Sequence, residues 1–233
     1  MKTTTALIIS TAIASLASVS CVTTGGLPPT FAEQKALTPD TVISDLMAGN
    51  KRYMKGNLSN PNVTKRIAAT STGQYPKAVI LSCLDSRVPV EQVFDQGVGD
   101  IFVGRVAGNI ENGDQLGSME FATKVAGAKL VMVLGHESCG AVKSACDHVK
   151  VGNITGLLSN ITPAVNSVSG IPASQRNSKN ADFVEKVVEA NVEKTVADIR
   201  SRSKILRDLE KSGDIKIVGG VYSISDGSVT LLD

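Results

Sequence analysis

The chain has 233 residues, which is enough for one domain with a substantial core but too few for two typical domains. Its 42% hydrophobic and 20% charged residues are ordinary for a globular protein, and its net charge of +2 comes without a cluster of Lys and Arg, which argues against nucleic-acid binding. Aromatic residues make up only 3% and tryptophan is absent, so aliphatic side chains must build the core.

The N-terminus has the layout of a secretory signal peptide. Lys2 precedes an apolar run, Ala6–Ala17, and small residues then lead to Cys21. The run is too short for a comfortable membrane span. We therefore predict a signal peptide at residues 1–21 and export to the periplasm or beyond. Bacterial lipoproteins are lipidated on a cysteine at this place, but Ser18 stands where leucine is usual. Membrane anchoring through Cys21 and plain cleavage nearby are both compatible with the sequence.

The rest of the chain is predicted to be a linker followed by one domain. Residues 22–37 contain a Gly pair and a Pro pair and are predicted to be the linker, and residues 38–233 the domain. Thr38–Lys55 begins with a helix-start signal and continues with the apolar spacing of an amphipathic helix. A loop rich in Asn, Pro and Thr is predicted over Asn57–Thr64.

Short apolar runs alternate with helical patterns along the domain. Strands are predicted at Lys77–Leu81, Asp100–Gly104, Lys129–Leu134 and Ile215–Ser223, with a last short one at Ser228–Leu232 after an Asp-Gly turn. Helices are predicted at Asp114–Ala126, from about Ala141, and over 181–211, where the pattern allows a break near Arg202. This alternation predicts an α/β fold with a central, mainly parallel β-sheet flanked by helices and preceded by an N-terminal helical arm.

Two of the predicted strands end in residues that can bind a metal. Cys83, Asp85 and Arg87 follow the first strand, and His136 and Cys139 follow the third. Because the carboxyl ends of parallel strands meet at one edge of a sheet, we expect these side chains to lie together. Two thiols and an imidazole are sufficient for a catalytic zinc ion, with a fourth position open to water. Zinc lowers the pKa of bound water to about 7 and so supplies hydroxide at neutral pH.

Asp85 and Arg87 are predicted to act as a pair. They are two residues apart in an extended segment, so their side chains can lie on the same side and form a bidentate contact. The carboxylate could then accept a hydrogen bond from the metal-bound water, while the guanidinium keeps the carboxylate in place and ionised. If Arg87 released it, Asp85 could occupy the open position as a fourth ligand in an inactive state.

The same residues allow other interpretations. The zinc site could be closed and structural if Cys146 were a fourth ligand, although its spacing from Cys139 is more typical of a residue on the core face of a helix. Cys83 or Cys139 could instead be the nucleophile of a metal-independent Cys–His hydrolase. His148, the only other histidine, is predicted to lie on the surface, with a proton-relay role as the alternative.

Five segments resemble the β-carbonic anhydrase family. CLDSRV at Cys83–Val88 closely resembles its C-x-D-S-R-V signature, and GHESCGA at Gly135–Ala141 resembles its G-H-x-x-C-G motif. The other three segments are Gly99–Arg105, Ser118–Ala122 and Gly220–Leu231. The similarity runs in the family's order over roughly residues 38–233.

The resemblance implies a lyase that interconverts carbon dioxide and bicarbonate with one zinc ion per chain. It implies that Cys83, His136 and Cys139 bind the zinc and that Asp85 and Arg87 form the catalytic dyad. The mechanism that it implies is attack of zinc hydroxide on carbon dioxide, with the hydroxide oriented by Asp85.

The resemblance also implies substrate contacts and an assembly. Gln74 matches a glutamine that reaches a neighbouring subunit's active site, while Phe102, Ala107 and Phe121 match residues that line the carbon dioxide pocket. The family forms dimers, often paired into tetramers, in which an N-terminal helical arm wraps the partner. The Thr38–Lys55 segment is expected to be that arm.

The sequence departs from the family at two places and leaves two rival functions open. Val106–Asn109 differs from the Asn-Val-Ala-Asn of many members, and Ile80 replaces the tryptophan of the bicarbonate-inhibited subgroup, so that regulatory site is not expected. Related proteins with the same zinc set hydrolyse carbon disulfide or carbonyl sulfide. A non-catalytic zinc- or bicarbonate-binding module is the other rival, although it would not need Asp85 and Arg87.

Overall fold

The computed structural model describes residues 26–59 and 61–232. The predicted signal peptide and Cys21 lie outside these ranges. Within them, no helix is both long enough and apolar enough to cross a membrane.

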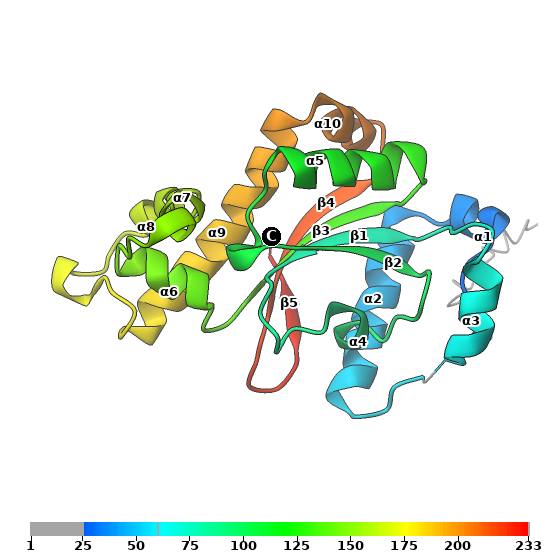
Figure 1. The fold of residues 1–233 in the computed structure, drawn as a ribbon, viewed down its shortest axis with the longest axis horizontal. Coiled ribbons are helices and arrows are strands. Elements are labelled where there is room, and N and C mark those ends of the chain that lie inside the picture. The colour runs from blue at the N-terminus through cyan, green and yellow to red at the C-terminus, as the bar shows by residue number, and fades with distance from the viewer. Residues whose placement is uncertain (1–25, 60, 233) are drawn as a thin grey trace, which may run out of the picture.

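A five-stranded sheet with the order β2-β1-β3-β4-β5 forms the centre of the molecule (Figure 1). The first four strands in that order are parallel, and β5 runs antiparallel to β4. The mainly parallel sheet predicted from the sequence is therefore confirmed, and every strand begins one residue after its predicted start. The strands are β1 (Ala78–Ser82), β2 (Ile101–Arg105), β3 (Leu130–His136), β4 (Lys216–Tyr222) and β5 (Val229–Leu231).

The two central strands are buried along their whole length. All residues of β1 and β3 are buried, as expected for parallel strands that are covered on both faces. Alternate residues point to opposite faces. Ile80 and Met132 therefore join one apolar cluster, while Val79 and Val131 join another. This explains why the strands read as continuous apolar runs in the sequence.

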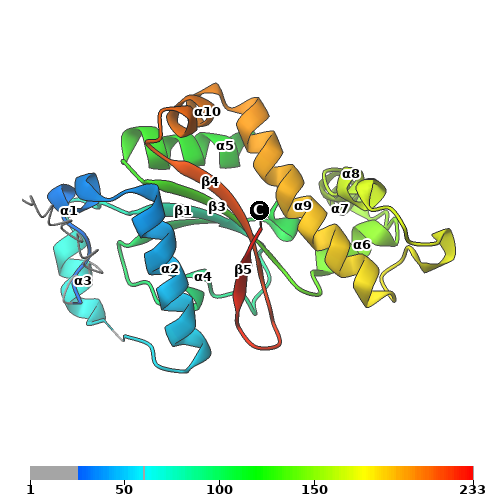
Figure 2. The same cartoon turned by 180° about the vertical axis from the view of Figure 1, so that it is seen from behind.

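Helices cover both faces of the sheet (Figures 1 and 2). One face is covered by α2 (Pro39–Met54) and α4 (Val90–Val93). The other face is covered by α5 (Gly113–Glu120), α9 (Ala181–Arg202) and α10 (Lys204–Lys211). A π-helical turn, Phe121–Val125, continues α5, so the two together match the predicted helix.

The break predicted near Arg202 is confirmed. Ser203 lies between α9 and α10, and its hydroxyl accepts a hydrogen bond from the amide of Leu206 in the first turn of α10. The same hydroxyl donates to Glu120 at the end of α5. The side chain of Ser203 thus caps the second helix and fixes the corner to the neighbouring helix.

Helix α2 confirms the helix predicted at the N-terminal end of the domain. Its N-cap is Thr38 and its first residue is Pro39. Val42 and Leu46 are fully buried against α4 and the sheet of the same chain. This apolar face is therefore covered within its own subunit, and the expected contact of the helix with a partner stays a prediction.

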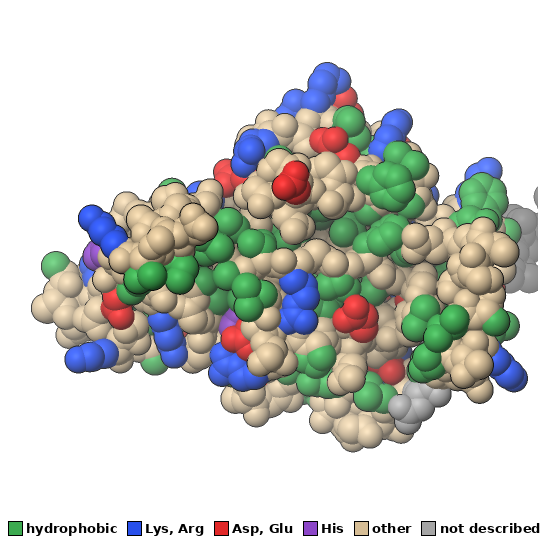
Figure 3. Space-filling view, viewed as in Figure 1, with side chains coloured by type: hydrophobic (Ala, Val, Ile, Leu, Met, Phe, Trp, Pro, Cys, Tyr) green, Lys and Arg blue, Asp and Glu red, His purple; other side chains and the backbone are tan. Residues whose placement is uncertain are grey.

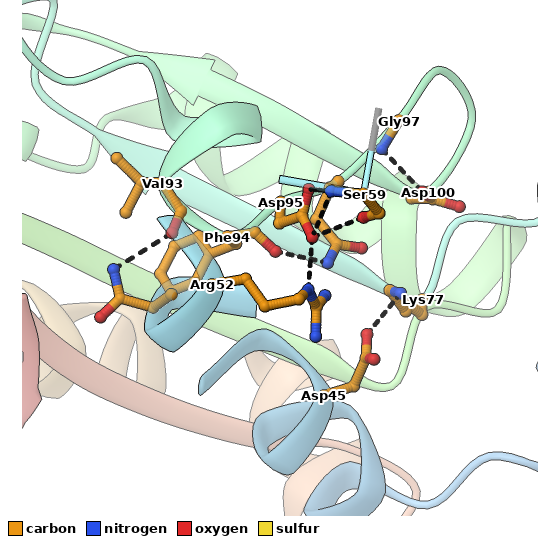
Figure 4. A network of polar contacts seen from close by, with 11 residues as sticks. Asp45, Arg52, Ser59, Lys77, Val93, Phe94, Asp95, Gly97 and Asp100 are labelled. Atoms are coloured by element: carbon orange, nitrogen blue, oxygen red, sulfur yellow. Dashed lines mark hydrogen bonds and ion pairs between the residues drawn. The ribbon is translucent and has the colours of Figure 1, made fainter. Parts of the chain in front are cut away.

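Polar contacts at both ends of α2 fix it to the domain (Figure 4). Lys77, just before β1, forms an ion pair with Asp45 at 2.6 Å. Arg52 forms an ion pair with Asp95, which follows α4 and also accepts hydrogen bonds from Ser59. These contacts join the helix to the loops at the amino end of the sheet.

Two helices lie where the sequence predicted a linker and a loop. Helix α1 (Phe31–Ala36) falls within the predicted linker and starts with a capping box in which Thr30 and Glu33 bond each other's backbone. The buried side chain of Gln34 donates to the carbonyls of Pro76 and Ala126 at 2.7 and 2.8 Å. Residues 30–37 therefore pack onto the domain instead of forming a free linker. Helix α3 (Val63–Thr70) begins at the end of the predicted loop.

A group of short helices extends beyond the carboxyl edge of the sheet (Figure 1). It contains α6 (Gly140–Cys146), α7 (Gly152–Ser159), α8 (Thr162–Ser167) and a 3₁₀ turn (Ala173–Gln175). Only the start of α6 was predicted. These helices pack with the first half of α9 in a third apolar cluster, which also contains Cys83 and Cys139. The candidate metal ligands are thus embedded between the sheet edge and this helical group.

Candidate active site

The register of the sheet brings the two motifs together. Ser82, the last residue of β1, pairs with Leu134 of β3. Cys83 follows Ser82 directly, while His136 is the last residue of β3. Both side chains therefore lie at the carboxyl edge of neighbouring parallel strands, as predicted.

Cys83, His136 and Cys139 form a compact donor set. Their ligand atoms all lie within 4.8 Å of one another, all three residues are buried, and the two sulfur atoms are 3.9 Å apart. In the described part of the chain, no other group of three or more Cys, His, Asp or Glu side chains was found that could hold a metal in this way. The predicted set is thus assembled by the fold.

His136 presents one ring nitrogen to this group. Its Nδ1 is 2.9 Å from the carbonyl oxygen of Glu137, to which it can donate a hydrogen bond. The other nitrogen, Nε2, is buried and has no hydrogen-bond partner. A buried polar atom without a partner is costly, and metal-binding histidines usually donate their second nitrogen to a carbonyl or carboxylate. Both features fit a histidine whose Nε2 is a metal ligand.

The electrostatics of the thiols favour a bound cation. The contact with Cys139 lowers the pKa of Cys83, against the effect of burial, and the nearby His136 ring and the amide of Gly108 act in the same direction. The same contact and burial raise the pKa of Cys139. Burial lowers the pKa of His136, but contact with the charged Cys83 outweighs it and leaves the pKa raised. These opposite shifts indicate that the two sulfurs and the imidazole titrate as one coupled group.

Asp85 and Arg87 form the predicted bidentate pair. Arg87 Nε and Nη2 donate to the two carboxylate oxygens at 2.9 and 2.8 Å, and the Arg87 amide donates to Oδ1 at 3.0 Å. These contacts hold the pKa of Asp85 well below its usual range. Asp85 Oδ2 lies 3.8 Å from His136 Nε2, so the ionised carboxylate borders the donor set. The Arg87 side chain is half exposed, whereas that of Asp85 is mostly covered.

The end of β2 supports this segment from the side. Arg105 donates to the carbonyls of Cys83 and Asp85 and so fixes both ends of the intervening peptide. After β2, the chain forms the 3₁₀ turn Ala107–Asn109, in which the amide of Gly108 donates to Cys83 Sγ at 3.4 Å. Sequence reasoning assigned no role to either residue: Arg105 was noted only as the end of a segment that resembles the family, and Gly108 only as part of one that departs from it.

Glu137 is another residue that sequence reasoning missed. Its carboxylate accepts hydrogen bonds from Ser223 Oγ and the amide of Ile224, both at 3.0 Å. Its amide also donates to the carbonyl of Tyr222, the last residue of β4. The peptide that orients His136 is therefore tied to the loop between β4 and β5.

Cys146 and His148 lie outside the donor set. Cys146 is buried in α6 among apolar side chains, and burial, with a smaller contribution from the charge of Asp147, raises its pKa to about 11. Because it does not belong to the metal-binding group, the structure offers no fourth thiol for a closed zinc site among the described residues. His148 is exposed after the end of α6, as predicted for a surface residue.

The predicted substrate residues are not gathered in one place by a single chain. Phe102 and Phe121 line a cavity of about 600 Å³ between β2 and α5, but neither Ala107 nor any of the metal-binding residues lines it. Gln74 is exposed in the loop before β1, at the edge of the sheet opposite to Cys83. Within one chain, Gln74 therefore lies away from the donor set.

Comparisons with known proteins agree on one family. The profile of the family described as "Carbonic anhydrase" matches residues 78–229. "Carbonic anhydrase 2" of Mycobacterium tuberculosis is 36% identical over 194 residues, which cover 81% of this chain and 90% of that protein. Among solved structures, a Coccomyxa β-carbonic anhydrase in complex with acetazolamide has a TM-score of 0.63 at 23% identity and covers 83% of this chain and 82% of its own.

A tetrameric β-carbonic anhydrase of Sordaria macrospora has a TM-score of 0.62 at 20% identity, with 83% of this chain and 97% of that chain covered. The region matched by the profile contains both motifs of the donor set, and the two structures have the same fold. The chain belongs to the β-carbonic anhydrase family and is a carbonic anhydrase.

Proposed function

We propose that this protein catalyses the reversible hydration of carbon dioxide to bicarbonate and a proton, with one zinc ion held by Cys83, His136 and Cys139. The observation that carries the proposal is the buried donor set within 4.8 Å, whose His136 Nε2 has no protein partner and is bordered by the Asp85 carboxylate. Family membership supports the reaction, and the donor set supports the metal.

The chemistry of the donors suits zinc. Two sulfur ligands and one imidazole nitrogen match the ligands of known catalytic zinc sites with three protein ligands, and the soft thiolates disfavour magnesium and calcium. A zinc ion in such a set makes water acidic enough to lose its proton near neutral pH. Asp85 is held by Arg87 and does not belong to the set, so a fourth position is left for water or substrate.

Asp85 acts as the orienting acceptor in the proposed mechanism. An ionised carboxylate can only accept hydrogen bonds. Asp85 can therefore accept a hydrogen bond from the attacking water and orient it so that an oxygen lone pair faces the carbon of carbon dioxide. Arg87 keeps Asp85 ionised and fixes its direction through three hydrogen bonds. Because Arg87 is half exposed, a change in its surroundings could release Asp85 towards the donor set, which is the inactive state proposed from the sequence.

The active enzyme is proposed to be a homodimer or a larger homo-oligomer. In the described chain β2 pairs only with β1, so its outer edge is free to contact another chain. Figure 3 shows apolar side chains on the surface around α5 and β2. Phe121 and Val125 are 56% and 70% exposed there, next to the cavity lined by Phe102. A second copy on this face would cover these side chains, and its Gln74 could contribute to the site.

Export is proposed from the sequence alone. The charged Lys2, the apolar run Ala6–Ala17 and the small residues up to Cys21 support a signal peptide. Mass spectrometry of the mature N-terminus, after expression of the full chain in a bacterial host, would distinguish lipidation at Cys21 from plain cleavage. An uncleaved N-terminus would contradict the proposal.

The reaction is tested by stopped-flow carbon dioxide hydration on purified residues 22–233, with the zinc content measured on the same sample. We expect about one zinc per chain, and activity that is lost in Cys83→Ser with the metal and lost in Asp85→Asn without loss of metal. Asp182→Asn, an exposed carboxylate in the first turn of α9, is the matched control and should be fully active. A zinc-loaded wild type that is inactive from neutral to alkaline pH would contradict the proposal, and carbon disulfide would then be the next substrate.

A further inference from the structure

The side chain of Asn191 is placed where an amide is costly. It lies on α9 between valines that face the core, and it is only 1% exposed. Its Nδ2 donates to the carbonyl oxygen of Gly108 at 2.8 Å, while its Oδ1 is buried without a partner. A buried amide with one unpaired end destabilises a core, so an apolar residue of similar size would pack there at lower cost.

The packing of Val192, the next residue on α9, determines how closely Asn191 approaches the sheet. The methyl groups of Val192 fit over two glycines on adjacent strands, Gly135 of β3 and Gly219 of β4. A Cβ atom at either glycine would lie 2.6 or 2.7 Å from a Val192 methyl group, which is far inside van der Waals contact. The glycines therefore let α9 approach the carboxyl half of the sheet closely enough for Asn191 to reach the chain after β2.

Gly108 connects Asn191 to the metal-binding sulfur. Its amide donates to Cys83 Sγ at 3.4 Å, and its carbonyl accepts from Asn191, so the residue is held on both sides of its Cα. Its φ of +73° is favourable for glycine, and a Cβ there would be 2.5 Å from Ile161 Cδ1. The backbone at this position is thus held in one conformation by groups from β1, α8 and α9.

We propose that Asn191 is a positioning residue that, through Gly108, aims a backbone N–H at Cys83 and thereby tunes the sulfur as a metal ligand. The proposal rests on the metal binding proposed above. Residues that hydrogen-bond to the groups around a metal ligand typically change metal affinity about 10–100-fold when they are removed. This role explains why an amide is kept in the apolar face of α9.

The variant Asn191→Leu removes the donor and keeps the branched shape of the side chain, with the same number of heavy atoms. We expect its zinc dissociation constant, measured by competition with a chelator, to rise about 10–100-fold relative to wild type. Thr195→Val is the matched control, because Thr195 is a buried residue one turn later on α9 whose hydroxyl donates only to the carbonyl of Asn191. Its zinc affinity should stay within about twofold of wild type, even if its free energy of unfolding falls as much as that of Asn191→Leu.

A spectroscopic measurement tests the hydrogen bond itself. In wild-type protein loaded with cadmium-113, we expect a scalar coupling between the metal and the amide proton of Gly108, transmitted through Cys83 Sγ. The coupling should weaken or vanish in Asn191→Leu and persist in Thr195→Val. If Asn191→Leu does not fold, Asn191→Ser, whose hydroxyl is too short to reach the carbonyl, takes its place.

The outcomes separate the two proposals. A wild type that binds neither zinc nor cadmium contradicts the proposed function. A wild type that binds metal but shows no coupling to Gly108 overturns the role of Gly108 and Asn191 alone. Unchanged affinity and unchanged coupling in the Asn191 variant also overturn it, and they leave the zinc site intact.

Discussion

The close packing of α9 on the sheet leads to a quantitative prediction for Gly135→Ala. The new Cβ would lie 2.6 Å from Val192 Cγ2 and 3.4 Å from Val188 Cγ1. Carbon atoms normally approach to about 3.5–4.0 Å, so the first contact is short by roughly 1 Å. Both partners are buried side chains on the face of α9 that packs against the sheet, and overpacking of this kind costs about 1–3 kcal/mol.

For a chain of this size, we expect the melting temperature of Gly135→Ala to fall by roughly 2–12 °C. Urea unfolding followed by circular dichroism, at one protein concentration for all variants, measures the free energy directly. Gly113→Ala is the matched control, because a Cβ at Gly113 in the first turn of α5 meets nothing within 4 Å. Its stability should be unchanged or slightly higher.

A double-mutant cycle tests the cause of this loss. Val192→Ala removes the methyl groups that the new Cβ would strike, so the two substitutions together should cost at least about 1 kcal/mol less than the sum of their separate effects. If Gly135→Ala is as stable as wild type, or if the two effects simply add, the packing argument is wrong.

Three further predictions concern the site. Arg87→Ala should raise the pKa of Asp85 towards its ordinary value and lower the rate of carbon dioxide hydration at least about tenfold, with zinc content unchanged. Full activity of this variant would contradict the role of the Asp85–Arg87 pair. After metal is removed with a chelator, a mild disulfide oxidant should join Cys83 and Cys139, whose sulfurs are 3.9 Å apart, whereas the zinc-loaded protein should keep both thiols. Equal rates of thiol loss in the two samples, measured by thiol titration, would contradict this protection. Cys146, whose pKa is raised by burial to about 11, should resist iodoacetamide at pH 8 in the folded protein, and rapid labelling detected by peptide mass spectrometry would refute its burial.

Local sequence pattern was sufficient to predict the central fold and the donor set. Strand positions follow from local runs of branched apolar residues, and β1 to β5 each lie one residue from their predicted starts. The two motifs were recognisable because Cys83, His136 and Cys139 lie two, two and five residues after the end of a predicted strand. In a parallel sheet, strand ends share an edge, so local pattern was sufficient to bring residues 53 positions apart together.

Short helices were not determined by local pattern. Helix α1 has six residues and α3 has eight, too few for a clear apolar repeat. Helix α1 is held by the contacts of Gln34 with Pro76 and Ala126, the latter 92 positions away. Such contacts exist only after the chain has folded, which is why this segment resembled a linker in the sequence.

The contacts that support the site depend on tertiary packing and could not be predicted from local pattern. Gly108 and Asn191 are 83 positions apart, and each looks ordinary in its own segment. Their contact depends on the docking of Val192 over Gly135 and Gly219, on two different strands. Apolar periodicity and motif spacing are properties of residues that are close in the sequence. A backbone hydrogen bond to a ligand sulfur depends instead on how the end of β2, helix α9 and the edge of the sheet pack together in three dimensions.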